Sequence, residues 1–146
     1  MIDGVILTPL KRIATDNGDV FHGMKISEPT YYGFGEAYFS TVSKNAIKGW
    51  KKHTKMNMNL MVPNGCIQFV IFDDRELSPT YNSFYSIKLS PENYYRLTIP
   101  AGLWVAFRGI AISGNLLMNF SDIMHDPDES LTTDISNIPY EWDNNE

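Results

Sequence analysis

The feature that most constrains the fold is a succession of short segments rich in β-branched and aromatic residues, with turn residues between them. Apolar residues in these segments lie mainly on alternate positions, which is the period of a strand buried on one face. No window of about a dozen residues carries an apolar stripe at helical spacing. The sequence therefore predicts an all-β fold, with short helices at most and those near the C-terminus. The predicted strands are 4–8, 20–26, 36–42, 46–51, 56–62, 66–72, 84–89, 94–99, 103–107 and 116–120.

The connections between these segments indicate how the strands are arranged. Asn64-Gly65 is the preferred pair of a tight primed turn, so we expect 56–62 and 66–72 to form a hairpin. Many short strands in a chain of 146 residues favour a sandwich or a barrel, because doubling or closing a sheet removes most exposed edges. We expect one domain over residues 1–146. The acidic C-terminal segment is too apolar for a free tail, and we expect it to pack back on the barrel through Ile135, Ile138, Tyr140 and Trp142.

Net charge and cysteine content limit the binding partners and the cellular compartment that we expect for the protein. The net charge of −5 argues against nucleic-acid binding, because affinity for the phosphate backbone depends on many Lys and Arg contacts. Cys66 is the only cysteine, which excludes an intrachain disulfide and suits a reducing compartment. No apolar run approaches the roughly 18 residues of a membrane span, and the N-terminus lacks the features of a secretory leader. We expect a cytoplasmic protein that binds neither nucleic acid nor membrane.

Basic residues concentrate in one segment, 44–55, which includes Lys48-Gly49-Trp50-Lys51-Lys52-His53. Lysines at a barrel mouth would neutralise a diphosphate through charge-assisted hydrogen bonds, although a solvated strand end gives the same pattern. On a strand, Lys51 and His53 share one face and Trp50 and Lys52 the other. Lys51 and His53 are therefore predicted to face one cavity together.

Two residues of this segment are candidate bases. His53 can transfer a proton near neutral pH if a carboxylate orients it, and an exposed histidine is the alternative. Lys51 is the second candidate, provided that burial and neighbouring cations favour its neutral amine. The other histidines, His22 and His125, are too widely spaced for a site of three histidines and a carboxylate, so we expect no metal and no cofactor. Tyr38 and Trp50 are candidate ligand contacts, with an aromatic core as the alternative.

The order of these motifs resembles the dTDP-4-keto-6-deoxyglucose 3,5-epimerase family of cupins, from about residue 16 to residue 142. That family carries Arg-Gly-Leu-His-Tyr-Gln on one strand, then a tight turn, a strand ending in Asp-Leu-Arg, and Ser-Pro-Thr. The corresponding residues here are Lys48 to His53, Asn64-Gly65, Asp73-Asp74-Arg75 and Ser78-Pro79-Thr80. The resemblance implies a cupin-type double-stranded β-helix, or jelly roll, a nucleotide-diphosphate sugar as ligand, and a homodimer.

The same alignment shows where the chain departs from the family. Lys51 stands at the family's catalytic His and Lys48 at its phosphate-binding Arg. Asn119 and His125 stand at two family tyrosines, the first of them the general acid. His53 matches the second histidine of the related 3,4-ketoisomerases, and Asp134 matches the carboxylate that orients the epimerase base.

The resemblance thus implies an epimerase or isomerase of a nucleotide-linked 4-keto-6-deoxy sugar in surface-polysaccharide synthesis, acting by proton abstraction next to the ketone without a metal. A sugar-nucleotide-binding protein without turnover and an accessory β-barrel are the alternatives, because the family's catalytic His and Tyr are replaced. The roles expected are His53 or Lys51 as base, Asp134 as its orienting carboxylate, His125 or Tyr38 as the proton donor, and Lys48, Arg75 and Arg108 as phosphate ligands.

Overall fold

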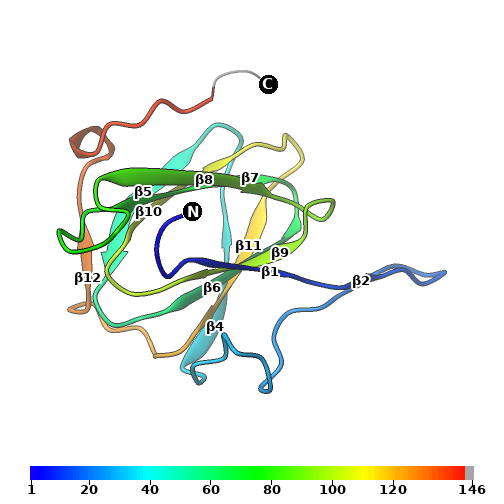
Figure 1. Ribbon diagram of the computed structural model, residues 1–146. Coiled ribbons are helices and arrows are strands. Elements are labelled where there is room, and N and C mark those ends of the chain that lie inside the picture. The colour runs from blue at the N-terminus through cyan, green and yellow to red at the C-terminus, as the bar shows by residue number, and fades with distance from the viewer. Residues whose placement is uncertain (144–146) are drawn as a thin grey trace.

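The computed structural model describes residues 1–143, whose strands form two facing five-stranded antiparallel sheets (Figure 1). One sheet has the order β1-β9-β6-β11-β4 and the other has the order β12-β5-β10-β7-β8. From β4 to β7, and again from β8 to β12, consecutive strands alternate between the sheets, which is the winding of a jelly roll. The strands are β1 (Ile6–Pro9), β2 (Arg12–Ile13), β3 (Val20–Phe21), β4 (Glu36–Thr41), β5 (Ile47–His53), β6 (Met58–Asn64), β7 (Ile67–Asp73), β8 (Ser83–Leu89), β9 (Tyr95–Ile99), β10 (Trp104–Gly109), β11 (Leu116–Ser121) and β12 (Ser130–Thr132).

The all-β prediction is confirmed, and the differences lie in the shortest strands. Each predicted segment contains a strand, but the segment 20–26 keeps only Val20–Phe21, which pairs with β2 in a small hairpin. This hairpin projects from the body of the molecule (Figure 1). The strands β2 and β12 were not predicted, because two or three residues are too few to show a period. The 3₁₀ helix η1 (Ile135–Asn137) is the only helix within residues 1–143, close to the C-terminus as expected.

Asn64-Gly65 does not close a hairpin, and that prediction was wrong. The strand β6 lies between β9 and β11, whereas β7 lies between β10 and β8, so the turn carries the chain from one sheet to the other. Gly65 has a φ of 80°, and a Cβ there would lie 2.3 Å from the carbonyl oxygen of Gly114. The glycine is therefore required by a close approach of the loop before β11, and not by the pairing of the strands that flank it.

The apolar core fills the space between the sheets. Leu60, Leu97 and Ile99 enter from one sheet, and Phe69 and Ile71 enter from the other. All five side chains are at most 4% exposed. This packing provides the main stabilisation of the fold and sets the spacing of the two sheets.

A second cluster lies on the outer face of the sheet that contains β5. Trp50, Val70 and Ala106 are buried there beneath residues 133–143, which we call the C-terminal strap. The strap residues that pack on this cluster are Ile135, Ile138, Tyr140 and Trp142, as the sequence predicts. The inner face of β5 is thereby left to the cavity described next. No helix within the described residues is long and apolar enough to span a membrane.

Candidate functional site

A cavity of about 240 Å³ opens between the two sheets. Its polar lining comes from the edge strand β4, from β5 and from β11, and its apolar lining comes from β6, β10 and β11. None of the described residues that line it is acidic. The polar or cationic side chains are Tyr38, Ser40, Lys48, Lys51, His53 and Asn119, and the apolar ones are Met58, Leu60, Val105, Phe107 and Leu117.

A bulge in β5 places two lysines on the same wall of this cavity. Val105 pairs with Lys51, but Phe107 pairs with Lys48, so β5 has one more residue than β10 over this stretch. Strict alternation would place Lys48 on the face of Trp50, whereas the extra residue turns it toward the cavity beside Lys51. The prediction that Lys51 and His53 face one cavity holds, and Lys48 joins them.

His53 and Glu129 form a buried pair behind the cavity wall. Nδ1 of His53 is hydrogen-bonded to Oε1 of Glu129, and both residues are at most 6% exposed. Oε2 of Glu129 accepts hydrogen bonds from the backbone N–H groups of Thr54, Lys55 and Met56 at 3.2, 3.0 and 3.2 Å. Burial alone raises the pKa of the Glu129 carboxyl, but the hydrogen bonds from His53 and from the backbone outweigh it and lower this pKa below its usual value. An ionised carboxylate is therefore fixed beside the imidazole.

Tyr38 faces this wall from β4 and is held by Asn119 on β11. Oδ1 of Asn119 accepts a hydrogen bond from the backbone N–H of Asn59 at 3.1 Å, which fixes the orientation of the amide. Nδ2 then donates to the hydroxyl oxygen of Tyr38 at 3.0 Å. Because that oxygen accepts from Asn119, the phenolic hydrogen is free to be donated into the cavity.

The two cavity lysines differ in their surroundings. Nζ of Lys48 donates to the carbonyl oxygen of Thr41 at 2.6 Å and to Oγ of Ser40 at 3.2 Å, and so spans the gap between β5 and β4. The side chain of Lys51 has no hydrogen-bond or ion-pair partner among residues 1–143 and lies against the cavity next to His53. Lys48 is thus held at one end of the opening, and Lys51 is available to a ligand.

Three of the predicted ligand contacts lie outside the cavity. Trp50 is 1% exposed on the opposite face of β5, where its Nε1 donates to the carbonyl oxygen of Ile138 at 3.1 Å. Arg75 makes a bidentate pair with buried Asp73, with contacts of 2.8 and 2.9 Å. Arg108 donates to the carbonyl oxygen of Asp143 at 2.5 Å, in the C-terminal strap. Each of these side chains stabilises the fold at its own position, and none of them lines the cavity.

The expected carboxylate and one expected proton donor also lie elsewhere. Asp134 accepts hydrogen bonds from the backbone N–H and the hydroxyl of Ser136 at 2.9 and 2.6 Å, and so caps η1. His125 is exposed and does not line the cavity. The carboxylate that contacts His53 is Glu129, which directly precedes β12 in a register that pairs Ser130 with His53. Only the pairing of β12 with β5 distinguishes Glu129 from the other acids of this segment, and a strand of three residues shows no period by which it could be predicted.

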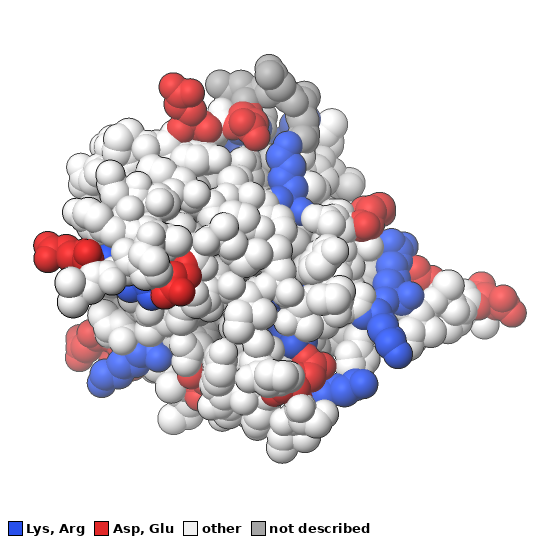
Figure 2. Space-filling model, viewed as in Figure 1, with Lys and Arg blue, Asp and Glu red and all other residues white. Residues whose placement is uncertain are grey.

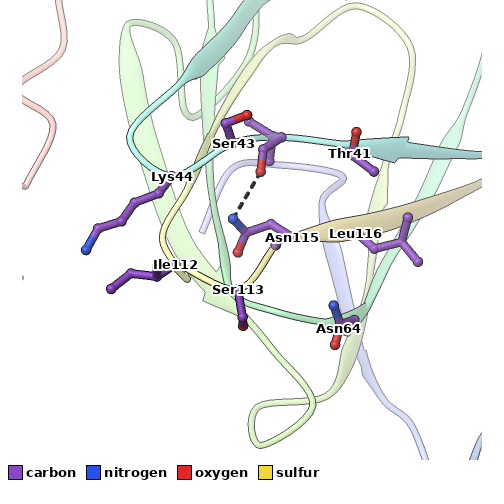
Figure 3. Close-up of a pocket in the computed structure, with 10 residues that line it drawn as sticks. Thr41, Ser43, Lys44, Asn64, Ile112, Ser113, Asn115 and Leu116 are labelled. Atoms are coloured by element: carbon purple, nitrogen blue, oxygen red, sulfur yellow. Dashed lines mark hydrogen bonds between the residues drawn. The ribbon is translucent and has the colours of Figure 1, made fainter.

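A wider and more open cavity of about 550 Å³ lies where Thr41 ends β4 (Figure 3). Lys44 and Ile112 project at one side of it, and Nδ2 of Asn115 donates to the carbonyl oxygen of Val42 at 3.0 Å. The same carboxamide is also bonded to the backbone of residues 66 and 111, so its polar atoms are satisfied within the protein. The described residues contain no group of three His, Cys, Asp or Glu side chains that could hold a metal ion.

Fold and site together define a jelly-roll protein with a cationic cavity between its sheets and a histidine–carboxylate pair in the cavity wall. No protein-family model matches the chain. A solved structure of a dTDP sugar isomerase from Desulfovibrio desulfuricans G20 matches with a TM-score of 0.92 and 35% identity, over 99% of this chain and 94% of that one.

Two curated proteins are also similar. The spore coat polysaccharide biosynthesis protein SpsL of Bacillus subtilis is 28% identical over 98% of this chain and 91% of its own length. The probable low-salt glycan biosynthesis epimerase Agl13 of Haloferax volcanii is 30% identical over 106 residues, which are 72% of this chain and 66% of that protein. The chain belongs to the family of RmlC-like cupins that includes the dTDP-sugar epimerases and isomerases.

Proposed function

We propose that the protein is a metal-independent epimerase or isomerase of a nucleotide-linked 4-keto-6-deoxy sugar, acting in the cytoplasm in surface-polysaccharide biosynthesis. The observation that carries the proposal is His53, which is hydrogen-bonded at Nδ1 and lines a cavity with two lysines and no acid among its described lining residues. The names of the relatives support it, since they include a dTDP sugar isomerase and a glycan biosynthesis epimerase. At about 240 Å³ the cavity lies below the roughly 300–1,000 Å³ of pockets for drug-sized ligands, so it suits the sugar and leaves the nucleotide outside.

The chemistry follows from the walls of the cavity. His53 removes the proton from the carbon next to the ketone, and the ammonium of Lys51 stabilises the enolate oxygen that forms. Tyr38, on the other side of the cavity, returns a proton from its free phenolic hydrogen. Lys48 binds the diphosphate at the end of the opening. The apolar lining from β6, β10 and β11 accommodates the deoxygenated carbon of the sugar.

Hydrogen exchange at the sugar tests the proposal. The protein is incubated with a dTDP-4-keto-6-deoxy sugar in deuterated water, and proton NMR follows the signals next to the ketone. We expect deuterium to enter at a catalysed rate, and we expect H53N to lose this rate by about 10²–10⁴-fold, the usual contribution of a general base. Calorimetric binding of dTDP without exchange on any keto sugar would instead indicate a binding protein without turnover.

The β2–β3 hairpin supports a second part of the proposal, that the protein is a homodimer. Among the described strands these two pair only with each other, and they project from the body, with basic side chains near the base and acidic ones at the tip (Figure 2). Ile13 and Val20 on the hairpin are 47% and 52% exposed, so apolar surface is left uncovered in the single chain. Light scattering should give twice the chain mass of 16.6 kDa, and a monomeric mass would contradict the proposal.

A further inference from the structure

We infer that Glu129 is a positioning residue that holds His53 in one tautomer and thereby makes its Nε2 the base of the cavity. The inference rests on the proposed function, in which His53 removes the proton. Glu129 occupies neither of the positions that the family resemblance gives to the catalytic pair, which fall on Lys51 and Asp134.

The tautomer follows from the hydrogen bond between Glu129 and His53. An ionised carboxylate can only accept hydrogen bonds, so the proton between Oε1 of Glu129 and the ring must belong to Nδ1. In the neutral ring the other nitrogen, Nε2, then carries the lone pair. His53 lines the cavity, so this lone pair is the acceptor that His53 offers to a ligand there.

The surroundings of Glu129 keep it ionised and in place. Three successive backbone N–H groups, those of residues 54–56, donate to Oε2, and the side chain is 3% exposed. The backbone N–H of Thr54 also donates to the carbonyl oxygen of Glu129 at 2.8 Å. The turn after β5 is therefore folded around this one carboxylate, and the turn carries His53 at its start. A neutral residue at 129 would leave these donors without a charged partner.

The charged and titratable groups that face His53 from the cavity are cations and a phenol, so the carboxylate of Glu129 is the anion that sets the position of the ring proton. Lys48 and Lys51 lie on β5 and Tyr38 lies on β4, while β6, β10 and β11 present only apolar side chains and Asn119. The imidazole thus has two cations in front of it and one anion behind it. The anion is the only described group in contact with the ring that favours a proton on Nδ1.

E129Q is the sharpest variant, because it keeps the size of the side chain and an acceptor for the backbone N–H groups. The side-chain amide can donate to Nδ1, which places the ring proton on Nε2 and removes the lone pair from the cavity. D134N is the matched control, since Asp134 is an acid of the same C-terminal segment that only caps η1. E129D keeps the carboxylate on a side chain that is shorter by one methylene group.

Nitrogen-15 NMR of the histidine rings reads the tautomer directly, and the chain has only three histidines to assign. We expect the Nδ1–H tautomer of His53 in the wild type and in D134N, and the Nε2–H tautomer or a mixture in E129Q. A wild-type protein with the Nε2–H tautomer, or an E129Q protein with an unchanged one, would overturn the inference. The wild-type spectrum gives this answer even if E129Q folds poorly.

Kinetics then connect the tautomer with turnover. The exchange rate of E129Q should fall about 10²–10⁴-fold, because the wrong tautomer removes the contribution of His53 as general base. E129D should recover part of the rate, and D134N should stay within about twofold of wild type. A full rate in E129Q would overturn the inference, whereas no exchange by the wild type on any keto sugar, with the tautomer as expected, refutes the proposed function alone.

Discussion

The substitution Gly49→Ala tests whether the bulge in β5 builds the cavity wall. Gly49 lies at this bulge with a φ of 138°, in a region that is nearly restricted to glycine. A Cβ there would lie 2.5 Å from Cβ of Ala106, 2.7 Å from its Cα and 2.9 Å from the carbonyl oxygen of Val105. Two of these three atoms are backbone, so β5 and β10 must separate to admit the methyl group.

Two costs add in G49A. The backbone strain of a non-glycine residue at this φ is on the order of 1–3 kcal/mol. Overpacking by one methyl group costs about 1–3 kcal/mol more. Gly18, in the projecting hairpin, has a φ of 132° and nothing within 4 Å of its ideal Cβ, so G18A carries the first cost without the second. G49A should therefore be less stable than G18A by about 1–3 kcal/mol, or roughly 3–10 °C in melting temperature for a chain of this size.

Urea unfolding followed by circular dichroism measures the free energy of unfolding of both variants. Calorimetric titration with dTDP measures their affinity for the nucleotide, and so tests whether the cavity lysines keep their positions. G49A should also bind dTDP more weakly than G18A. The separation of β5 from β10 displaces both cavity lysines of β5, Lys48 and Lys51. A G49A protein whose free energy of unfolding lies within about 0.5 kcal/mol of that of G18A would refute the steric argument. Unchanged dTDP binding by a destabilised G49A would show that the bulge does not position the lysines.

Three further substitutions test separate parts of the structure. Arg75 and neighbouring hydroxyls hold the pKa of Asp73 well below its usual range, so this pair stabilises the fold above the usual carboxyl pKa and that stability is lost as pH falls through the lowered pKa. D73N leaves Arg75, whose side chain is 31% exposed, without its carboxylate, and it should cost about 1.5–3 kcal/mol in urea unfolding at pH 7 and flatten the loss of stability in acid. K48Q should weaken dTDP binding about tenfold by calorimetry, since one charge-assisted hydrogen bond is worth roughly 1.5 kcal/mol or more. Y38F should lower kcat by about 10²-fold with little change in dTDP affinity, and an unchanged kcat would exclude the tyrosine as the proton donor.

The alternation of apolar and polar residues was enough to predict the longer strands and the opposite faces of Lys51 and Trp50 on β5. Alternation placed Lys51 and His53 on one face and Trp50 on the other, because these residues lie on the stretch of β5 where side chains alternate regularly. The apolar residues of the tail likewise predicted the packing of the C-terminal strap. These features depend on burial patterns that extend over five residues or more.

Features that depend on a partner strand could not be predicted in this way. The bulge that turns Lys48 toward the cavity exists only in the register of β5 against β10. Glu129 is one of several acids near the C-terminus, and only the pairing of the three-residue β12 selects it. Gly65 was interpreted as a hairpin residue because close approach to Gly114 and a primed turn leave the same mark in a sequence.

The hydrogen bonds of Lys48 determine what kind of ligand can compete for it. Its ammonium is already bonded to the carbonyl oxygen of Thr41 and the hydroxyl of Ser40, so an arriving ligand exchanges neutral acceptors for its own. A sugar hydroxyl offers an acceptor of the same neutral kind, and the exchange yields almost no free energy. A phosphate oxygen offers a charged acceptor, whose hydrogen bond is about twice as strong. Under the proposed function, Lys48 therefore selects by charge: it adds little to the binding of a free sugar and much to the binding of the same sugar on a diphosphate.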